Sequence, residues 1–149
     1  MSERGAVRLV EIFDAPRERV FAAWTEAELL KQWWGPGMFE TVSASVDLRV
    51  GGRYELLLEP GSMRLVGEFR EVDPPRRLVY TWQWIENVPD TRESLVTIEF
   101  HDRGEQTELV LVHDNFLGPG PVDMYDEGWR SGLGKLTAFL DKGANARDC

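Results

Sequence analysis

Hydrophobic positions near the N-terminus follow two periods in turn. Residues 7–13 are rich in Val, Ile and Phe and predict a β-strand that ends before Pro16. Asp14 is suited to cap a following helix, because a carboxylate there accepts hydrogen bonds from the free amides of the first turn. Apolar residues then recur on one helix face at Val20, Phe21, Trp24 and Ala27. The pattern predicts a strand followed by a helix.

A second short helix is predicted directly afterwards. Thr25 followed three positions later by Glu28 has the form of a capping box, which restarts the chain as a helix. Gly35 and Pro36 are expected to end it. Its apolar residues are Leu29, Leu30, Trp33 and Trp34.

From residue 39 to residue 115 the hydrophobic pattern alternates, which is typical of β-strands. Turn-forming glycines and prolines separate the alternating runs at hairpin length. The expected strands are residues 38–48, 53–58, 63–72, 77–85, 93–101 and 107–115. Together with the first strand they predict about seven antiparallel strands.

One long amphipathic helix is predicted near the C-terminus. A loop rich in Gly and Pro at residues 116–122 redirects the chain, and the helix is expected to end near Gly143. Its apolar residues follow steps of three and four: Tyr125, Trp129, Leu133, Leu136 and Leu140. No other predicted element is long enough to cover the concave face of a twisted sheet.

The expected fold class is therefore α+β, with a curved antiparallel sheet around one long C-terminal helix and two short helices after the first strand. The length of 149 residues fits one domain spanning residues 1–149, with a core at residues 7–142 and a loose tail at residues 143–149.

Charge and cysteine content narrow the classes of partner. A formal net charge of −9 with scattered basic residues argues against nucleic-acid binding. No apolar run is long enough for membrane insertion, and the N-terminus lacks the apolar region of a secretory signal. Cys149 is the only cysteine, which excludes an internal disulfide and fits a reducing cytoplasmic location.

Several motifs resemble one known family. These are Trp33-Trp34-Gly35-Pro36, Gly51-Gly52-Arg53-Tyr54, Gly67-Glu68-Phe69 before Pro74-Pro75-Arg76-Arg77-Leu78, Tyr80-Thr81-Trp82-Gln83-Trp84, and Gly128-Trp129 with Leu133. In this order, over about residues 7–142, they resemble the activator of heat-shock-protein-90 ATPase homologue family, a branch of the START-like, or SRPBCC, superfamily. The resemblance implies the helix-grip fold of the major birch pollen allergen, polyketide cyclases and lipid-transfer START domains, with a pocket between sheet and long helix.

The aromatic residues of one predicted strand are candidates for the wall of such a pocket. Tyr80, Trp82 and Trp84 share one face of the strand, where they could wall an apolar cavity or simply fill the core. The other interior positions expected by the same alternation are Leu56, Leu58, Leu65, Val96, Ile98, Leu109 and Leu111. The candidate ligand-binding residues are Trp33, Tyr54, Tyr80, Trp82, Trp84, His113, Tyr125, Gly128 and Trp129.

Three features of the last strand and last helix have alternative interpretations. His113 is expected on the inner face, where its imidazole could bind a ligand, exchange protons or be satisfied by a neighbour. Gly128 and Gly132 each cost the long helix about 1 kcal/mol relative to alanine. That cost suggests that the space beside the helix is used, either for close packing against the sheet or for a ligand.

No cofactor or metal is expected. Two separated histidines do not form a metal-binding cluster, and the chain has no phosphate-binding loop, dinucleotide fingerprint or nucleophile elbow. The favoured hypothesis is a non-enzymatic protein, possessing no catalytic residues, that binds a small hydrophobic or amphipathic molecule and is connected with stress. One alternative is a cyclase-like or hydratase-like enzyme using His113 and a tyrosine. The other is an interaction module that binds a chaperone or forms a homodimer.

Overall fold

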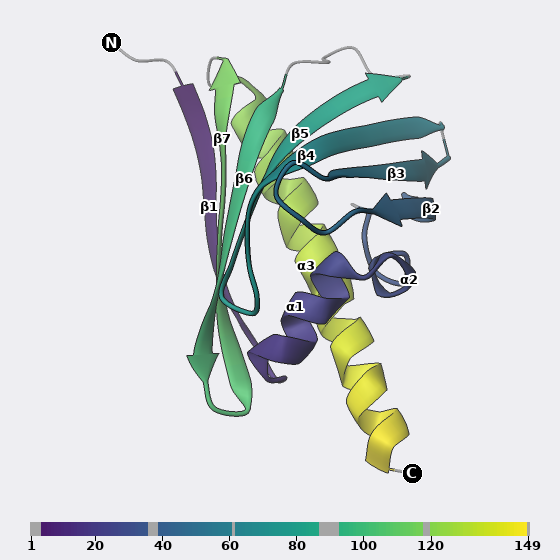
Figure 1. Cartoon of the computed structure of the whole chain (residues 1–149), viewed down its shortest axis with the longest axis vertical. Helices are drawn as coiled ribbons and strands as arrows, with labels where there is room; N and C mark the ends of the chain where they lie inside the picture. The colour runs from purple at the N-terminus through teal and green to yellow at the C-terminus, as the bar shows by residue number, and fades with distance from the viewer. Residues whose placement is uncertain (1–3, 36–38, 61, 87–92, 118–119, 149) are drawn as a thin grey trace.

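The computed structural model describes residues 4–35, 39–60, 62–86, 93–117 and 120–148 (Figure 1). Seven strands and three helices make up this part of the chain. The elements are β1 Arg4–Phe13, α1 Arg17–Thr25, α2 Ala27–Leu30, β2 Glu40–Val46, β3 Arg53–Glu59, β4 Met63–Asp73, β5 Arg77–Glu86, β6 Ser94–Arg103, β7 Gln106–Leu117 and α3 Gly120–Asp148.

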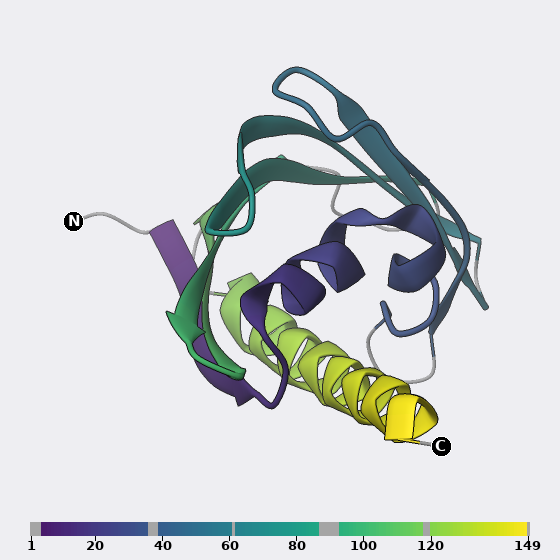
Figure 2. The same cartoon turned by 60° about the horizontal axis from the view of Figure 1, so that its bottom comes forward.

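The seven strands form one antiparallel sheet in the order β1-β7-β6-β5-β4-β3-β2. The first strand therefore lies beside the last, and β1 and β2 form the two edges. Register shifts interrupt the pairing of β1 with β7, β2 with β3 and β4 with β5. Such irregularities increase local twist, so the sheet curves around α1, α2 and α3 (Figure 2). The expected fold class is confirmed.

The alternating pattern identified the inner face of the sheet. Each of the seven aliphatic residues assigned to the interior is at most 2% exposed: Leu56, Leu58, Leu65, Val96, Ile98, Leu109 and Leu111. From α3 the apolar stripe buries Trp129, Leu133, Leu136 and Leu140 against them. Burying one such aliphatic side chain contributes roughly 1.5–3 kcal/mol, so this shared core holds the long helix against the sheet.

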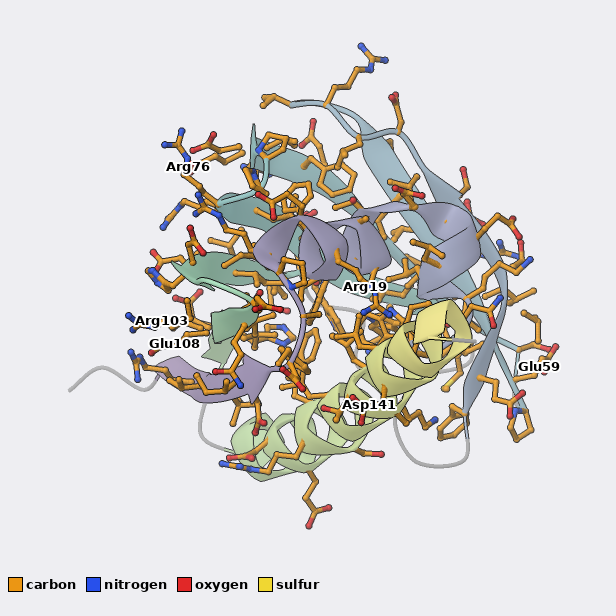
Figure 3. All side chains as sticks on the ribbon, turned by 90° about the horizontal axis from the view of Figure 1, so that it is seen from below. Arg19, Glu59, Arg76, Arg103, Glu108 and Asp141 are labelled. Carbon is orange, nitrogen blue, oxygen red and sulfur yellow. The ribbon has the colours of Figure 1, made fainter. Side chains whose placement is uncertain are left out.

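Two side-chain hydrogen bonds fix α3 to elements far away in the sequence. Arg19 of α1 donates from Nη2 to the backbone oxygen of Leu140, at 2.7 Å. Lys135 of α3 donates from Nζ to the backbone oxygen of Phe39, at 3.0 Å. Figure 3 shows Arg19 above the end of α3 that carries Asp141. In the same view Arg103 and Glu108 form an ion pair across the β6–β7 hairpin.

The predicted helix caps are wrong. Pro16, not Asp14, occupies the N-cap of α1, because the chain stays extended through Pro16 and its carbonyl accepts the first helical bonds, from Arg19 and Val20. The capping box is absent as well. Thr25 closes α1 instead, and its hydroxyl donates to the backbone oxygen of Phe21, at 2.9 Å.

Helix α3 continues to Asp148, beyond the end expected near Gly143. The residues after this glycine include Ala144, Ala146 and Arg147, which favour helix strongly enough to offset the cost of one glycine. At Gly132 a Cβ would meet no heavy atom of the described residues within 4 Å, so packing against these residues does not require a glycine there.

Replacing Gly132 or Gly134 with alanine is therefore expected to stabilise the protein by up to about 1 kcal/mol for each substitution. No heavy atom of the described residues lies within 4 Å of a Cβ added at either position, and alanine loses less backbone entropy than glycine on folding. Urea unfolding of the two variants measures the change. A loss of stability in Gly134→Ala, at an exposed position of the helix, would contradict this interpretation of the glycines.

Candidate functional site

A cavity of about 20 Å³ lies between the two short helices and the inner face of β2–β5. Its position differs from the one expected, because none of the described residues of α3 contributes to its wall. The apolar stripe of α3 fills the space beneath that helix instead, with side chains that are 5% exposed or less. The residues lining the cavity are Trp24, Leu30, Trp34, Val46, Tyr54, Leu56, Leu65, Phe69, Leu78, Tyr80 and Trp82.

The wall of this cavity is apolar and rich in aromatic rings. Six of its eleven residues are aromatic and none carries a charge. A volume of 20 Å³ accommodates about one water molecule. Sites for drug-sized ligands are usually several hundred Å³, so a ligand of that size requires the cavity to widen.

Two tyrosine hydroxyls contribute polar groups to the cavity wall. Tyr54 donates its hydroxyl hydrogen to the backbone oxygen of Thr81, at 2.6 Å. The oxygen of Tyr80 accepts the indole N–H of Trp24, at 3.3 Å. Burial raises the pKa of both phenols above the usual value of 10, so both hydroxyls are protonated at neutral pH.

The hydroxyl hydrogen of Tyr80 has no acceptor among the described residues. The side chain is only 5% exposed, and its single hydrogen bond uses the oxygen as acceptor. A phenol has one hydrogen to donate in addition to its acceptor sites. Leaving such a buried donor unpaired costs free energy, which a molecule inside the cavity could recover by accepting the hydrogen bond.

His113 belongs to a separate buried network on the other side of Trp82. The indole N–H of Trp129 donates to His113 Nδ1, at 3.0 Å, so the ring proton is on Nε2. Nε2 donates to the hydroxyl oxygen of Ser94, at 2.7 Å, and that hydroxyl donates to the backbone oxygen of Trp82, at 3.4 Å. The network joins β7 and α3 to the neighbouring strands.

This environment holds His113 in its neutral form. The side chain is fully buried, and burial lowers its pKa from 6.5 to about 3. Both ring nitrogens are engaged by Trp129 and Ser94, and His113 is not among the residues that line the cavity. The sequence allowed three roles for His113. The structure shows the third, in which neighbouring side chains form hydrogen bonds with the imidazole.

The structure separates the predicted site residues into two groups. Tyr54, Tyr80 and Trp82 line the cavity. Trp33, Trp84, His113, Gly128 and Trp129 are outside its wall, and the side chain of Tyr125 lies outside the described residues. Trp33 is held in the core by its indole N–H, which donates to the backbone oxygen of Ala23, at 3.0 Å.

Several residues of the cavity wall were not identified as candidates. The helical spacing predicts only burial for Trp24, and Trp33 rather than its neighbour Trp34 is the predicted candidate. Helix α2 ends at Leu30, so the turn that follows decides which of these two indoles faces the sheet. The motif Gly67-Glu68-Phe69 contained a usable signal, because Phe69 has the same inward phase as Leu65 on β4.

All six tryptophans of the chain belong to one connected group of ring contacts. Trp24 stacks on Trp129 with ring centroids 6.2 Å apart, and Trp82 packs against both Trp129, at 5.3 Å, and the His113 ring, at 4.7 Å. Trp24 and Trp82 also line the cavity. The cavity is therefore joined to the histidine network through rigid aromatic side chains.

Neither a metal centre nor a membrane span is found in the described part of the chain. No group of three or more His, Cys, Asp or Glu side chains there is arranged to hold a metal ion. Among the same residues, no helix has both the length and the apolar character needed to cross a membrane.

A curved antiparallel sheet that wraps around a long C-terminal helix, with two short helices after the first strand, defines the helix-grip class of proteins. The family model of activator of Hsp90 ATPase homolog 1-like proteins matches residues 14–141. The chain belongs to this family, as its sequence motifs predicted. Among curated proteins, no sequence matches it.

Solved structures share the fold over nearly the whole chain. The AHSA1 protein of Silicibacter pomeroyi is 28% identical, with a TM-score of 0.80 over 93% of this chain and 99% of that one. A protein of Chromobacterium violaceum is 25% identical, with a TM-score of 0.80 over 89% and 94%. DynU16, from the dynemicin biosynthetic locus, shares the fold at 23% identity and a TM-score of 0.72, over 93% of this chain and 48% of its own.

Proposed function

We propose that the protein binds a small, largely apolar molecule in the cavity between α1, α2 and β2–β5, without catalysing a reaction on it. The observation that carries this proposal is the aromatic wall around a buried hydroxyl whose hydrogen has no acceptor among the described residues. Mostly apolar surfaces with a few placed polar groups are typical of ligand sites. DynU16, which shares the fold, comes from a biosynthetic locus, which is consistent with a small-molecule ligand.

Ligand entry requires the cavity to widen, and α2 is the element best suited to move. It contains only four residues, and no side chain caps its N-terminus. Leu30 and Trp34, from this helix and the turn after it, form one side of the cavity. The hydroxyl of Thr41 donates to the backbone oxygen of Trp34, at 2.9 Å, and the Trp34 ring packs on Trp82 and Trp129, so the turn must give up these contacts to move. Outward movement of α2 and this turn would enlarge the cavity.

Equilibrium dialysis with 2-ethylnaphthalene tests the site with a matched pair of variants. Leu56 lines the cavity and is 2% exposed, whereas Leu57, the next residue of β3, faces the opposite side of the sheet. Leu56→Phe is expected to weaken binding at least about tenfold, because the larger ring occupies the space of the ligand. Leu57→Phe is expected to leave the dissociation constant unchanged.

Circular dichroism at the temperature of the binding assay verifies that both variants are folded. The proposal fails when the wild-type protein does not bind the probe saturably. It fails equally when Leu56→Phe, folded, binds as tightly as Leu57→Phe, because the probe then occupies another part of the molecule.

A further inference from the structure

We propose that the ligand of this cavity is a neutral, flat aromatic molecule with one hydrogen-bond-accepting oxygen, which the Tyr80 hydroxyl binds directly. This inference rests on the proposed binding function and specifies the chemistry of the ligand. Three properties of the cavity wall support it: the direction of its hydrogen bonds, its lack of charge and the arrangement of its rings.

The first property is the unused donor of Tyr80. Trp24 donates to the Tyr80 oxygen, so the hydroxyl hydrogen must seek an acceptor elsewhere, and none exists among the described residues. Tyr54, the second hydroxyl of the wall, already donates to the backbone oxygen of Thr81. The buried hydroxyl group that is left to be satisfied is thus a donor, and its partner must be an acceptor such as a ketone, aldehyde or ester oxygen.

The second property is the absence of charge from the wall. None of the eleven lining residues is ionisable at neutral pH, because the two tyrosines, the only titratable groups among them, have pKa values raised by burial. A carboxylate or ammonium group placed here would lose its hydration without gaining a counter-ion. The site therefore favours a neutral molecule over its charged analogue.

The third property is the arrangement of the aromatic rings. Tyr54, Phe69 and Tyr80 pack edge to face or tilted, with ring centroids 5.2–6.1 Å apart. Trp34 packs on Trp82 at 5.5 Å with a tilt of 44°. Walls of rigid rings contact a flat ring system over a large area, with little side-chain entropy to lose. An aromatic ligand can continue these contacts, with its oxygen directed toward Tyr80.

The test measures the affinity of three probes of nearly equal shape for the wild-type protein and for Tyr80→Phe. The probes are 2-acetylnaphthalene, 2-ethylnaphthalene and 2-naphthoate. The ketone is expected to bind the wild type about three- to tenfold more tightly than the hydrocarbon, the usual contribution of one hydrogen bond. In Tyr80→Phe this preference should disappear, while the affinity for the hydrocarbon is retained. Naphthoate should bind at least about tenfold more weakly than the ketone.

The outcomes separate this inference from the proposed function. If ketone and hydrocarbon bind the wild type equally, the cavity binds apolar molecules but Tyr80 does not select an acceptor, and the inference is overturned. Tight binding of naphthoate overturns the requirement for neutrality. If no probe binds at all, both proposals fail. Should Tyr80→Phe not fold, the comparison of the three probes with the wild type still decides the question.

Discussion

Lowering the pH from 7.5 to 4 is expected to destabilise the wild-type protein by about 3 kcal/mol more than His113→Gln. In the folded protein the pKa of His113 is about 3, because the ring is completely buried, whereas an exposed histidine titrates near 6.5. Between these values the unfolded chain binds a proton that the folded protein excludes. The contribution of His113 to stability is therefore fully present above pH 6.5 and decreases as the pH falls toward 3.

The geometry explains why the proton is excluded. A second ring proton would have to be placed on Nδ1, which already accepts the indole N–H of Trp129, so two donors would face each other in a dry site. Glutamine provides an amide donor and acceptor but does not titrate, and the carboxylates common to both proteins cancel in the comparison. Urea unfolding of both proteins across this pH range gives the difference. A difference that stays constant within about 0.5 kcal/mol would show that His113 does not resist protonation.

Replacing Gly67 with alanine is expected to lower the free energy of unfolding by about 3 kcal/mol. Gly67 lies on β4 directly opposite Tyr54 of β3, and the Tyr54 ring covers it. A Cβ there would lie 2.0 Å from the backbone oxygen of Thr81 and 2.4 Å from Cε2 of Tyr54. The contact with the backbone cannot be relieved by a rotamer change, so the strands or the ring must shift.

The matched control for Gly67→Ala is Gly134→Ala, where the same methyl group enters open space. Urea unfolding should show a large loss of stability for the first and none for the second. Because Tyr54 lines the cavity, Gly67→Ala should also weaken binding of 2-ethylnaphthalene in whatever fraction remains folded. A change below about 1 kcal/mol at Gly67 would mean that the close approach of Tyr54 is not needed.

The fold was predictable from the sequence because it depends on the period of the hydrophobic pattern and on the turn-forming residues between the elements. The alternating apolar residues, which include Leu56, Leu58 and Leu65, are typical of a sheet with one buried face. The steps of three and four from Trp129 to Leu140 are typical of an amphipathic helix. The caps were predicted less well. Asp14 and Thr25 have side chains suited to capping, but the positions where the helices begin depend on how the chain packs.

The cavity was harder to predict than the core around it. Hydrophobic spacing indicates that Tyr80, Trp82 and Trp84 point inward, but the contact of a ring with an empty space depends on every other side chain nearby. Trp82 lines the cavity, whereas its neighbour on the same face, Trp84, does not. His113 was placed correctly on the inner face, and only its hydrogen-bond partners on α3 and β6 show that it is satisfied there.

The central claim is that a ligand occupies the space beneath α1 and α2. Nuclear Overhauser contacts between bound 2-acetylnaphthalene and the leucine methyl groups of the wild-type protein test it most directly. We expect contacts to Leu30, Leu56 and Leu78, which line the cavity, and none to Leu133 or Leu136 of α3. Contacts to the α3 leucines, without contacts to those of the cavity, would contradict it.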